Sequence, residues 1–153
     1  MKQTRFSLFL IVAIVSVSCG GLSKQDQAEA YLAAASKFDA ARSVLREQNE
    51  NLPNTVEWAT IQKHNDSMAK SMLALSTDLA AINWTAEFTG VANQLIDCEY
   101  DRYALWQKVA TAPNIESAYA PSDSAYELYL ECIEIAKQLR RDLGLPPTEF
   151  VYP

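Results

Sequence analysis

The side chains that could do chemistry in this chain are limited first by its single histidine, His64. Ser-His-Asp and Cys-His nucleophilic catalysis would both have to use that one imidazole. The sequence has no Glu-x-x-His motif of di-iron bundles, no Cys-x-x-Cys-His haem attachment motif and no glycine-rich phosphate loop. Hydrolysis by paired carboxylates stays open with 19 acidic residues, although no pair stands out. We therefore expect neither enzymatic activity nor a cofactor.

That histidine belongs to one arrangement of potential metal ligands. His64, Met68 and Met72 are spaced four residues apart, which places them on one face of a helix. Imidazole and thioether groups are ligands that suit Cu(I). Methionines at helical spacing also fill hydrophobic cores, with the histidine at the polar edge. The spacing therefore gives a copper site as an alternative to ordinary core packing.

A second arrangement combines aromatic rings with carboxylates in the C-terminal half. Residues 87–134 hold nine acidic residues against Arg102 and Lys108, a local balance of −7. The tyrosines of this segment and the nearest acidic residues are Tyr100, Tyr103, Tyr126, Tyr129, Asp97, Asp101 and Glu127. Aromatic faces beside carboxylates could bind a cationic ligand or a basic segment of a partner. The alternative is that these are solvated helix faces whose tyrosines lie at their edges.

The first 18 residues have the pattern of a secretory signal. Lys2 and Arg5 precede a 12-residue apolar run over residues 6–17, interrupted only by serines. That run would cover about 18 Å of a hydrocarbon core about 30 Å thick, too short to span it comfortably. We therefore expect residues 1–18 to be cleaved as a signal peptide, with an uncleaved membrane anchor as the alternative.

The residues that follow resemble the lipobox of bacterial lipoprotein precursors. Ser16-Val17-Ser18-Cys19-Gly20-Gly21 places small residues directly before a cysteine, although Ser16 stands where leucine is usual. The resemblance covers about 20 of 153 residues and implies cleavage before Cys19, diacylglycerol on its thiol and acylation of the new amino terminus. Stable anchoring would follow from two or more acyl chains. The same residues could instead serve an ordinary signal peptidase, giving simple secretion.

The count of cysteines agrees with this interpretation. Three cysteines are an odd number for an exported protein, and lipid on Cys19 leaves Cys98 and Cys132 as a pair. If these two lie on neighbouring antiparallel helices, their mean position, (98 + 132)/2 = 115, falls in the loop expected between those helices. We expect a disulfide bridge, with two independent buried thiols as the alternative.

The composition favours helices. The chain has 153 residues with 49% hydrophobic residues, four glycines and a net charge of −6, which argues against collagen-like, low-complexity, β-sandwich and nucleic-acid-binding proteins. Removing residues 1–18 takes two basic residues, so the balance becomes 11 − 19, or −8. Prolines divide the remaining chain into long blocks with helical periodicity. We expect no nucleic-acid partner, because phosphate binding needs basic surface.

Four helices are predicted in these blocks. The first runs over about 23–49, capped by Ser23 with Asp26, and the second over about 55–82, capped by Asn54 with Glu57. The third passes through Trp84 and ends near Thr111; if neither Asn83 nor Thr85 caps it, the second and third helices fuse. Residues 112–120 are expected as a loop, and the fourth helix as starting at Pro121 and ending before a left-handed Gly144. The apolar stripes include Ala41 in the first helix, and Arg102 interrupts the stripe of the third.

These elements predict an all-α protein, an antiparallel up-down four-helix bundle over 23–145. Residues 19–22 would form a short lipidated tether and residues 146–153 an extended tail. The expected function is that of a lipid-anchored cell-envelope protein, facing away from the cytoplasm, which serves as a non-enzymatic binding or structural module. Its partners would be a membrane and an unidentified protein or small ligand. The alternative is a bundle that holds a small ligand or metal between its helices.

Overall fold

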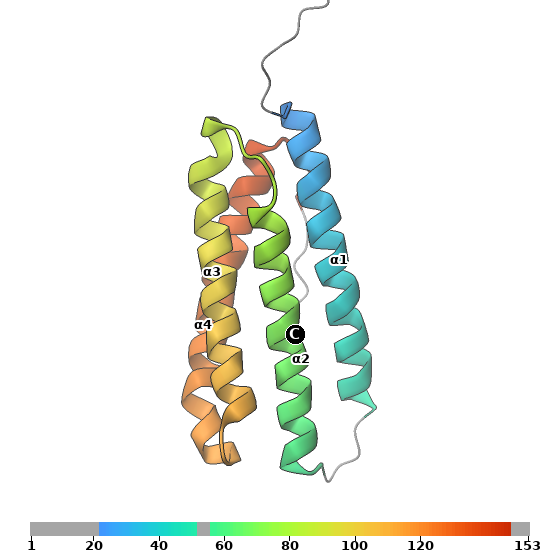
Figure 1. The fold of residues 1–153 in the computed structure, drawn as a ribbon, viewed down its shortest axis with the longest axis vertical. Helices are drawn as coiled ribbons and strands as arrows, with labels where there is room; N and C mark the ends of the chain where they lie inside the picture. The colour runs from blue at the N-terminus through green and yellow to red at the C-terminus, as the bar shows by residue number, and fades with distance from the viewer. Residues whose placement is uncertain (1–21, 52–55, 148–153) are drawn as a thin grey trace, which may run out of the picture.

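The computed structural model describes residues 22–51 and 56–147, which form four long helices. These are α1 (Lys24–Glu50), α2 (Trp58–Ala80), α3 (Ala86–Thr111) and α4 (Ile115–Asp142). They lie side by side along one axis, and the chain reverses its direction from each helix to the next (Figure 1). The predicted helical bundle is confirmed. The expected signal peptide and Cys19 lie outside the described residues, as does the tail from residue 148 onward.

The start of α1 follows its sequence signal. The backbone N–H of Asp26 donates to Ser23 Oγ at 3.1 Å, and the backbone N–H of Ser23 donates to Asp26 Oδ2 at 2.9 Å. This reciprocal capping box satisfies two of the amide groups that a helix leaves free at its N-terminus. The predicted capping pair is confirmed.

A fully buried glutamine helps to hold α2 and α3 apart as separate helices. The Trp84 indole N–H donates to the carbonyl of Leu79 at 3.0 Å, which occupies an acceptor at the end of α2. The backbone N–H of Thr85, the N-cap residue of α3, donates to Gln27 Oε1 in α1 at 2.8 Å. Gln27 is 0% exposed, and its amide nitrogen donates to the carbonyl of Leu22 at 3.0 Å. Thr85 is therefore the N-cap residue at which α3 begins, but the group that accepts its backbone N–H is a side chain of α1.

The other predicted start, that of α2, differs in its cap. Glu57 is the N-cap residue of α2 and its side chain makes no capping hydrogen bond, so its expected role inside a cap pair is wrong. Asn54, the expected partner, lies outside the described residues.

The start of α4 is a correction to the sequence prediction. The helix begins at Ile115, because Asn114 Oδ1 accepts the backbone N–H of Ser117 at 2.9 Å and caps the first turn. Pro121 lies inside the helix, where it lacks the N–H that would bond to the Ser117 carbonyl. One lost hydrogen bond in a 28-residue helix does not end it. At the other end, Gly144 has a φ of 74°, the left-handed conformation expected there.

The main core is shared by all four helices. Its largest fully buried side chains include Phe88, Leu79 and Leu139, each less than 2% exposed. One expectation fails here, because Ala41 is exposed. Arg102, which interrupts the apolar stripe of α3, is buried.

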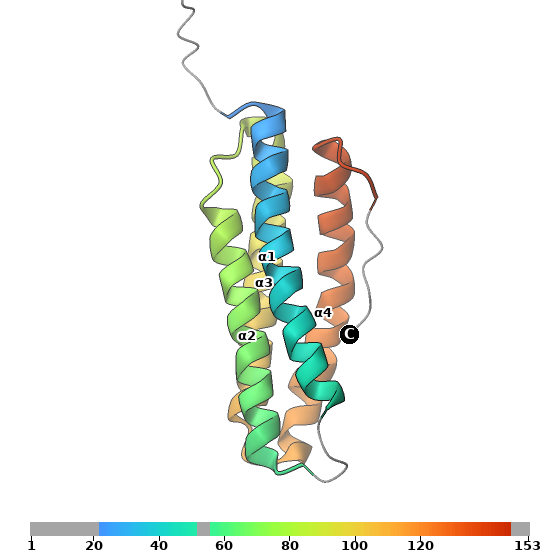
Figure 2. The ribbon, with the colours of Figure 1, turned by 90° about the vertical axis from the view of Figure 1, so that its right-hand side faces the viewer.

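The helices pack in sequence order. Close backbone packing joins α1 to α2, α2 to α3 and α3 to α4. Figure 2 shows a gap between α4 and α1 at the end of the bundle where α1 begins, and Figure 1 shows the two helices apart at the opposite end. As a result, α4 has one close helical neighbour, α3. Within the described residues, we find no helix with the length and apolar character needed to cross a bilayer.

Candidate functional site

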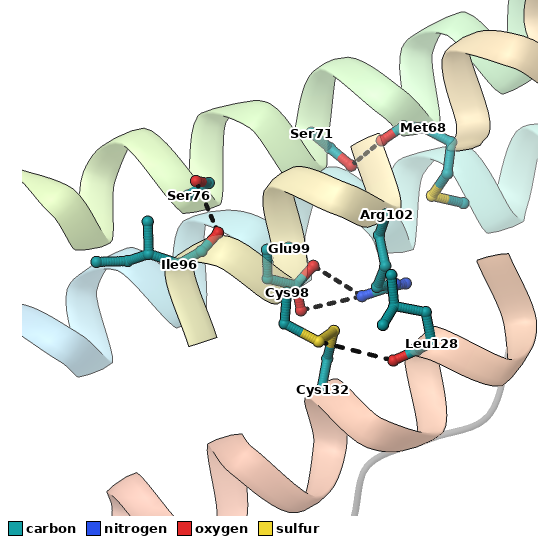
Figure 3. A network of polar contacts seen from close by, with 9 residues as sticks. All are labelled: Met68, Ser71, Ser76, Ile96, Cys98, Glu99, Arg102, Leu128 and Cys132. Atoms are coloured by element: carbon teal, nitrogen blue, oxygen red, sulfur yellow. Dashed lines mark hydrogen bonds and ion pairs between the residues drawn. A yellow bond between two sulfur atoms is a disulfide. The ribbon is translucent and has the colours of Figure 1, made fainter. Parts of the chain in front are cut away.

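A disulfide joins the two helices that carry most of the candidate residues. Cys98 on α3 and Cys132 on α4 are bridged, with their Cα atoms 5.7 Å apart and a sequence separation of 34 residues. Both residues lie in the core, at 6% and 1% exposure. The predicted bridge is confirmed (Figure 3), and it joins α4 to α3 about midway along α3.

Next to the bridge lies a buried ion pair that sequence reasoning missed. One Nη nitrogen of Arg102 donates to both carboxylate oxygens of Glu99, at 3.0 and 2.7 Å (Figure 3). Their side chains are only 5% and 7% exposed. Burial raises the pKa of Glu99 and lowers that of Arg102, while the opposite charge of each partner counteracts both shifts. The signal for this pair was the i, i+3 spacing of opposite charges on the apolar face of α3.

The ring of Tyr129 completes this interior polar group. The guanidinium carbon of Arg102 lies 4.6 Å from the centre of the Tyr129 ring, and that of Arg42 from α1 lies 5.6 Å from it. Arg42 lies at the same 5.6 Å distance from the Phe38 ring. These contacts match the range of cation–π interactions. The contact between Arg42 and Tyr129 connects α1 to α4 through side chains, although the backbones of these two helices do not pack closely.

The structure separates the four candidate tyrosines into two pairs. Tyr100 and Tyr103 contact each other on α3 with ring centres 5.7 Å apart, and Tyr126 and Tyr129 do so on α4 with ring centres 6.4 Å apart; both pairs are tilted. Gln107, one helical turn beyond Tyr103, bonds to Asp66 of α2, so the first pair lies on the flank toward α2. The second pair lies on the flank toward α1, because Tyr129 contacts Arg42. Tyr129 is 4% exposed and belongs to the core, whereas Tyr126 is 49% exposed.

The acidic residues named with these tyrosines are at the surface. Asp97, Asp101 and Glu127 are all exposed. Asp97 and Asp101 belong to α3, and Glu127 belongs to α4 next to Tyr126. Of the expected constellation, the structure therefore keeps Tyr126 with Glu127 on the surface of α4, and Tyr100 with Asp97 and Asp101 on the surface of α3.

The potential copper ligands lie along α2 as their spacing requires, but at different depths. Met72 is 1% exposed and fills the core, whereas His64 and Met68 are half-buried. Burial lowers the pKa of His64 below its ordinary value of 6.5. Within the described residues, no three His, Cys, Asp or Glu side chains are grouped so that they could hold a metal ion.

A further surface, on α4, emerges only in the structure. Eight large hydrophobic side chains are exposed in the described part of the chain, and half of them are on this helix: Ile115, Tyr119, Tyr126 and Leu130, at 43%, 59%, 49% and 39% exposure. Their spacings of four, seven and four residues align them on one face. We call these four residues the α4 stripe. The periodic signal was present in the sequence, but the predicted start at Pro121 left out its first two members.

Comparison with known proteins gives no assignment, since this chain matches no protein family, no curated protein and no solved structure.

Proposed function

We propose that this chain is a lipid-anchored protein of the bacterial cell envelope, held outside the cytoplasm through Cys19, and that it acts by binding a partner rather than by catalysis. The observation that carries the anchor is the Cys98–Cys132 bridge. The sequence has three cysteines, so the bridge leaves Cys19, at the end of the signal-like segment, as the third cysteine. Disulfides persist in oxidising compartments, which supports export.

The filled interior supports a module that binds at its surface. Phe88, Met72, Leu79 and Leu139 occupy the centre of the bundle at less than 2% exposure. A hollow of about 580 Å³ lies at the α3–α4 turn beside Lys108 and Ser117, and another of about 520 Å³ lies between Ala30 and Ile82. Both are open to solvent. A carrier of small ligands would need enclosed space among its helices, so we favour a protein partner.

Lipid on Cys19 is tested by the mass of the native protein. The full chain is expressed in a bacterium with labelled palmitate, extracted in detergent and analysed intact. We expect a polypeptide that begins at Cys19, carries the label and has no titratable thiol when denatured without reductant. Cys19→Ser should lose the label, while the control Cys98→Ser/Cys132→Ser should keep it. A leader still attached to the wild-type chain, or a bare thiol at Cys19, would contradict the proposed anchor.

A further inference from the structure

We propose that the α4 stripe is the docking face for a basic amphipathic helix of a partner protein. The inference deepens the proposed binding role but does not depend on lipid at Cys19. Its first support is the exposure of the stripe, which extends over 16 residues from Ile115 to Leu130, or about 22 Å along the helix. Apolar side chains aligned over this length on one face offer the kind of surface on which an amphipathic helix is recognised.

The second support is a row of carboxylates beside the stripe. Glu116, Asp123, Glu127 and Glu134 are separated by seven, four and seven residues and are all exposed. At about 100° per residue, this row lies roughly 60–80° around the helix from the stripe and runs parallel to it. Glu134 pairs with Lys137, whereas the other three have no ion pair among the described residues. The face therefore combines an apolar centre with one negatively charged edge.

This charge pattern selects the occupant. Lysine or arginine residues along one edge of a partner helix would meet the carboxylate row while its apolar residues cover the stripe. A second copy of this chain would bring another acidic row against the first, which electrostatic repulsion disfavours. An anionic bilayer surface would be repelled by the same carboxylates. The flank is open because α4 packs closely against α3 and not against α1 or α2.

Two synthetic peptides serve as probes for this face. One is an amphipathic helix with a leucine stripe and a lysine edge, and the other has glutamate in place of each lysine. Binding of labelled peptide to the whole mature chain is followed by fluorescence anisotropy at low and at physiological salt. We expect the basic peptide to bind at least about tenfold more tightly than the acidic one, and more weakly as salt rises.

Two double variants test the two halves of the face. Asp123→Lys/Glu127→Lys reverses part of the acidic row, and Tyr119→Ser/Tyr126→Ser removes the aromatic part of the stripe. Each should weaken binding of the basic peptide by at least about tenfold. Both pairs are exposed, so the melting temperature should stay close to that of the wild type.

A matched control separates this face from general charge attraction. Glu29→Lys/Glu87→Lys makes the same change in net charge on exposed residues near the starts of α1 and α3, at the far end of the bundle from Ile115 (Figure 1). This variant should bind the basic peptide within about twofold of the wild type. The proposal would be overturned if the control variant weakened binding equally, or if the chain preferred the acidic peptide. It would also be overturned if the chain formed a dimer that buries the stripe and excludes the peptide. None of these results would bear on the lipid at Cys19.

Discussion

Arg102 lies one turn after Glu99 on α3, and a single Nη nitrogen of its guanidinium reaches both oxygens of that carboxylate, at 3.0 and 2.7 Å, inside the bundle. The Nε–H of Arg102 is buried and has no hydrogen-bond partner within the described part of the chain. The two charges have thus lost their hydration, and hydrogen bonds within the protein replace it only in part. Removing one charge of such a buried pair destabilises the fold, whereas replacing both by apolar side chains is often neutral or stabilising.

We predict that Arg102→Met lowers the free energy of unfolding by about 3–5 kcal/mol, because it leaves the Glu99 carboxylate buried without its partner. The double variant Glu99→Leu/Arg102→Met should recover most of this loss, since it removes both buried charges. Urea unfolding of the two variants and the wild type measures the difference. A double variant as unstable as Arg102→Met would show that the pair itself stabilises the fold.

The disulfide should contribute mainly by restricting the unfolded chain. Its two cysteines are separated by 34 residues, so Cys98→Ala/Cys132→Ala should reduce the free energy of unfolding by about 3–4 kcal/mol in the chain-entropy model. Reduction of the wild-type protein should produce a similar loss in the same urea titration. Finding two titratable thiols in denatured, unreduced protein would instead mean that the bridge does not form.

Gln27 should matter more than a polar residue usually does. Gln27→Ala removes the acceptor for the Thr85 amide and two donations to backbone carbonyls, so we expect a loss of about 1–3 kcal/mol in thermal or urea unfolding. Gln25→Ala is the matched control, because Gln25 is exposed on the same helix, and it should cost less than about 0.5 kcal/mol. Equal losses in the two variants would remove the proposed role of Gln27 in connecting α1 to the start of α3.

His64 should make stability depend on pH in a defined direction. Burial lowers its pKa in the folded state below 6.5, so the unfolded chain takes up a proton first as the pH falls. The stabilising contribution is therefore complete above pH 6.5 and is lost as the pH falls below it toward the lower pKa of the folded state. His64→Gln should lose less stability than the wild type between neutral pH and about pH 5, measured as unfolding free energies. NMR titration of His64 should give a midpoint below 6.5, and a higher midpoint would reverse this prediction.

Local sequence signals predicted the helices well where the deciding interaction is local. The Ser23–Asp26 capping box and the left-handed Gly144 both act within a few residues of the chain, and both were found. The predicted helix start at Pro121 was wrong. Proline is common in the first turn of helices, but here the Asn114 side chain accepts the Ser117 N–H and starts the helix earlier in the chain. The spacing of Cys98 and Cys132 predicted their bridge because helices joined by a short loop bring residues of equal height together.

The sequence by itself determined the helical class and the signal-like segment that precedes Cys19, and it favoured the pairing of Cys98 with Cys132, because periodicity, residue count and local capping are properties of the chain alone. Only the tertiary structure decided that Arg102 is buried on Glu99, that Tyr129 is core while Tyr126 is surface, and that α4 keeps an open apolar flank. The physical reason is that burial depends on which neighbours approach each face of a helix. The apolar stripe of a single helix does not show whether another helix covers it.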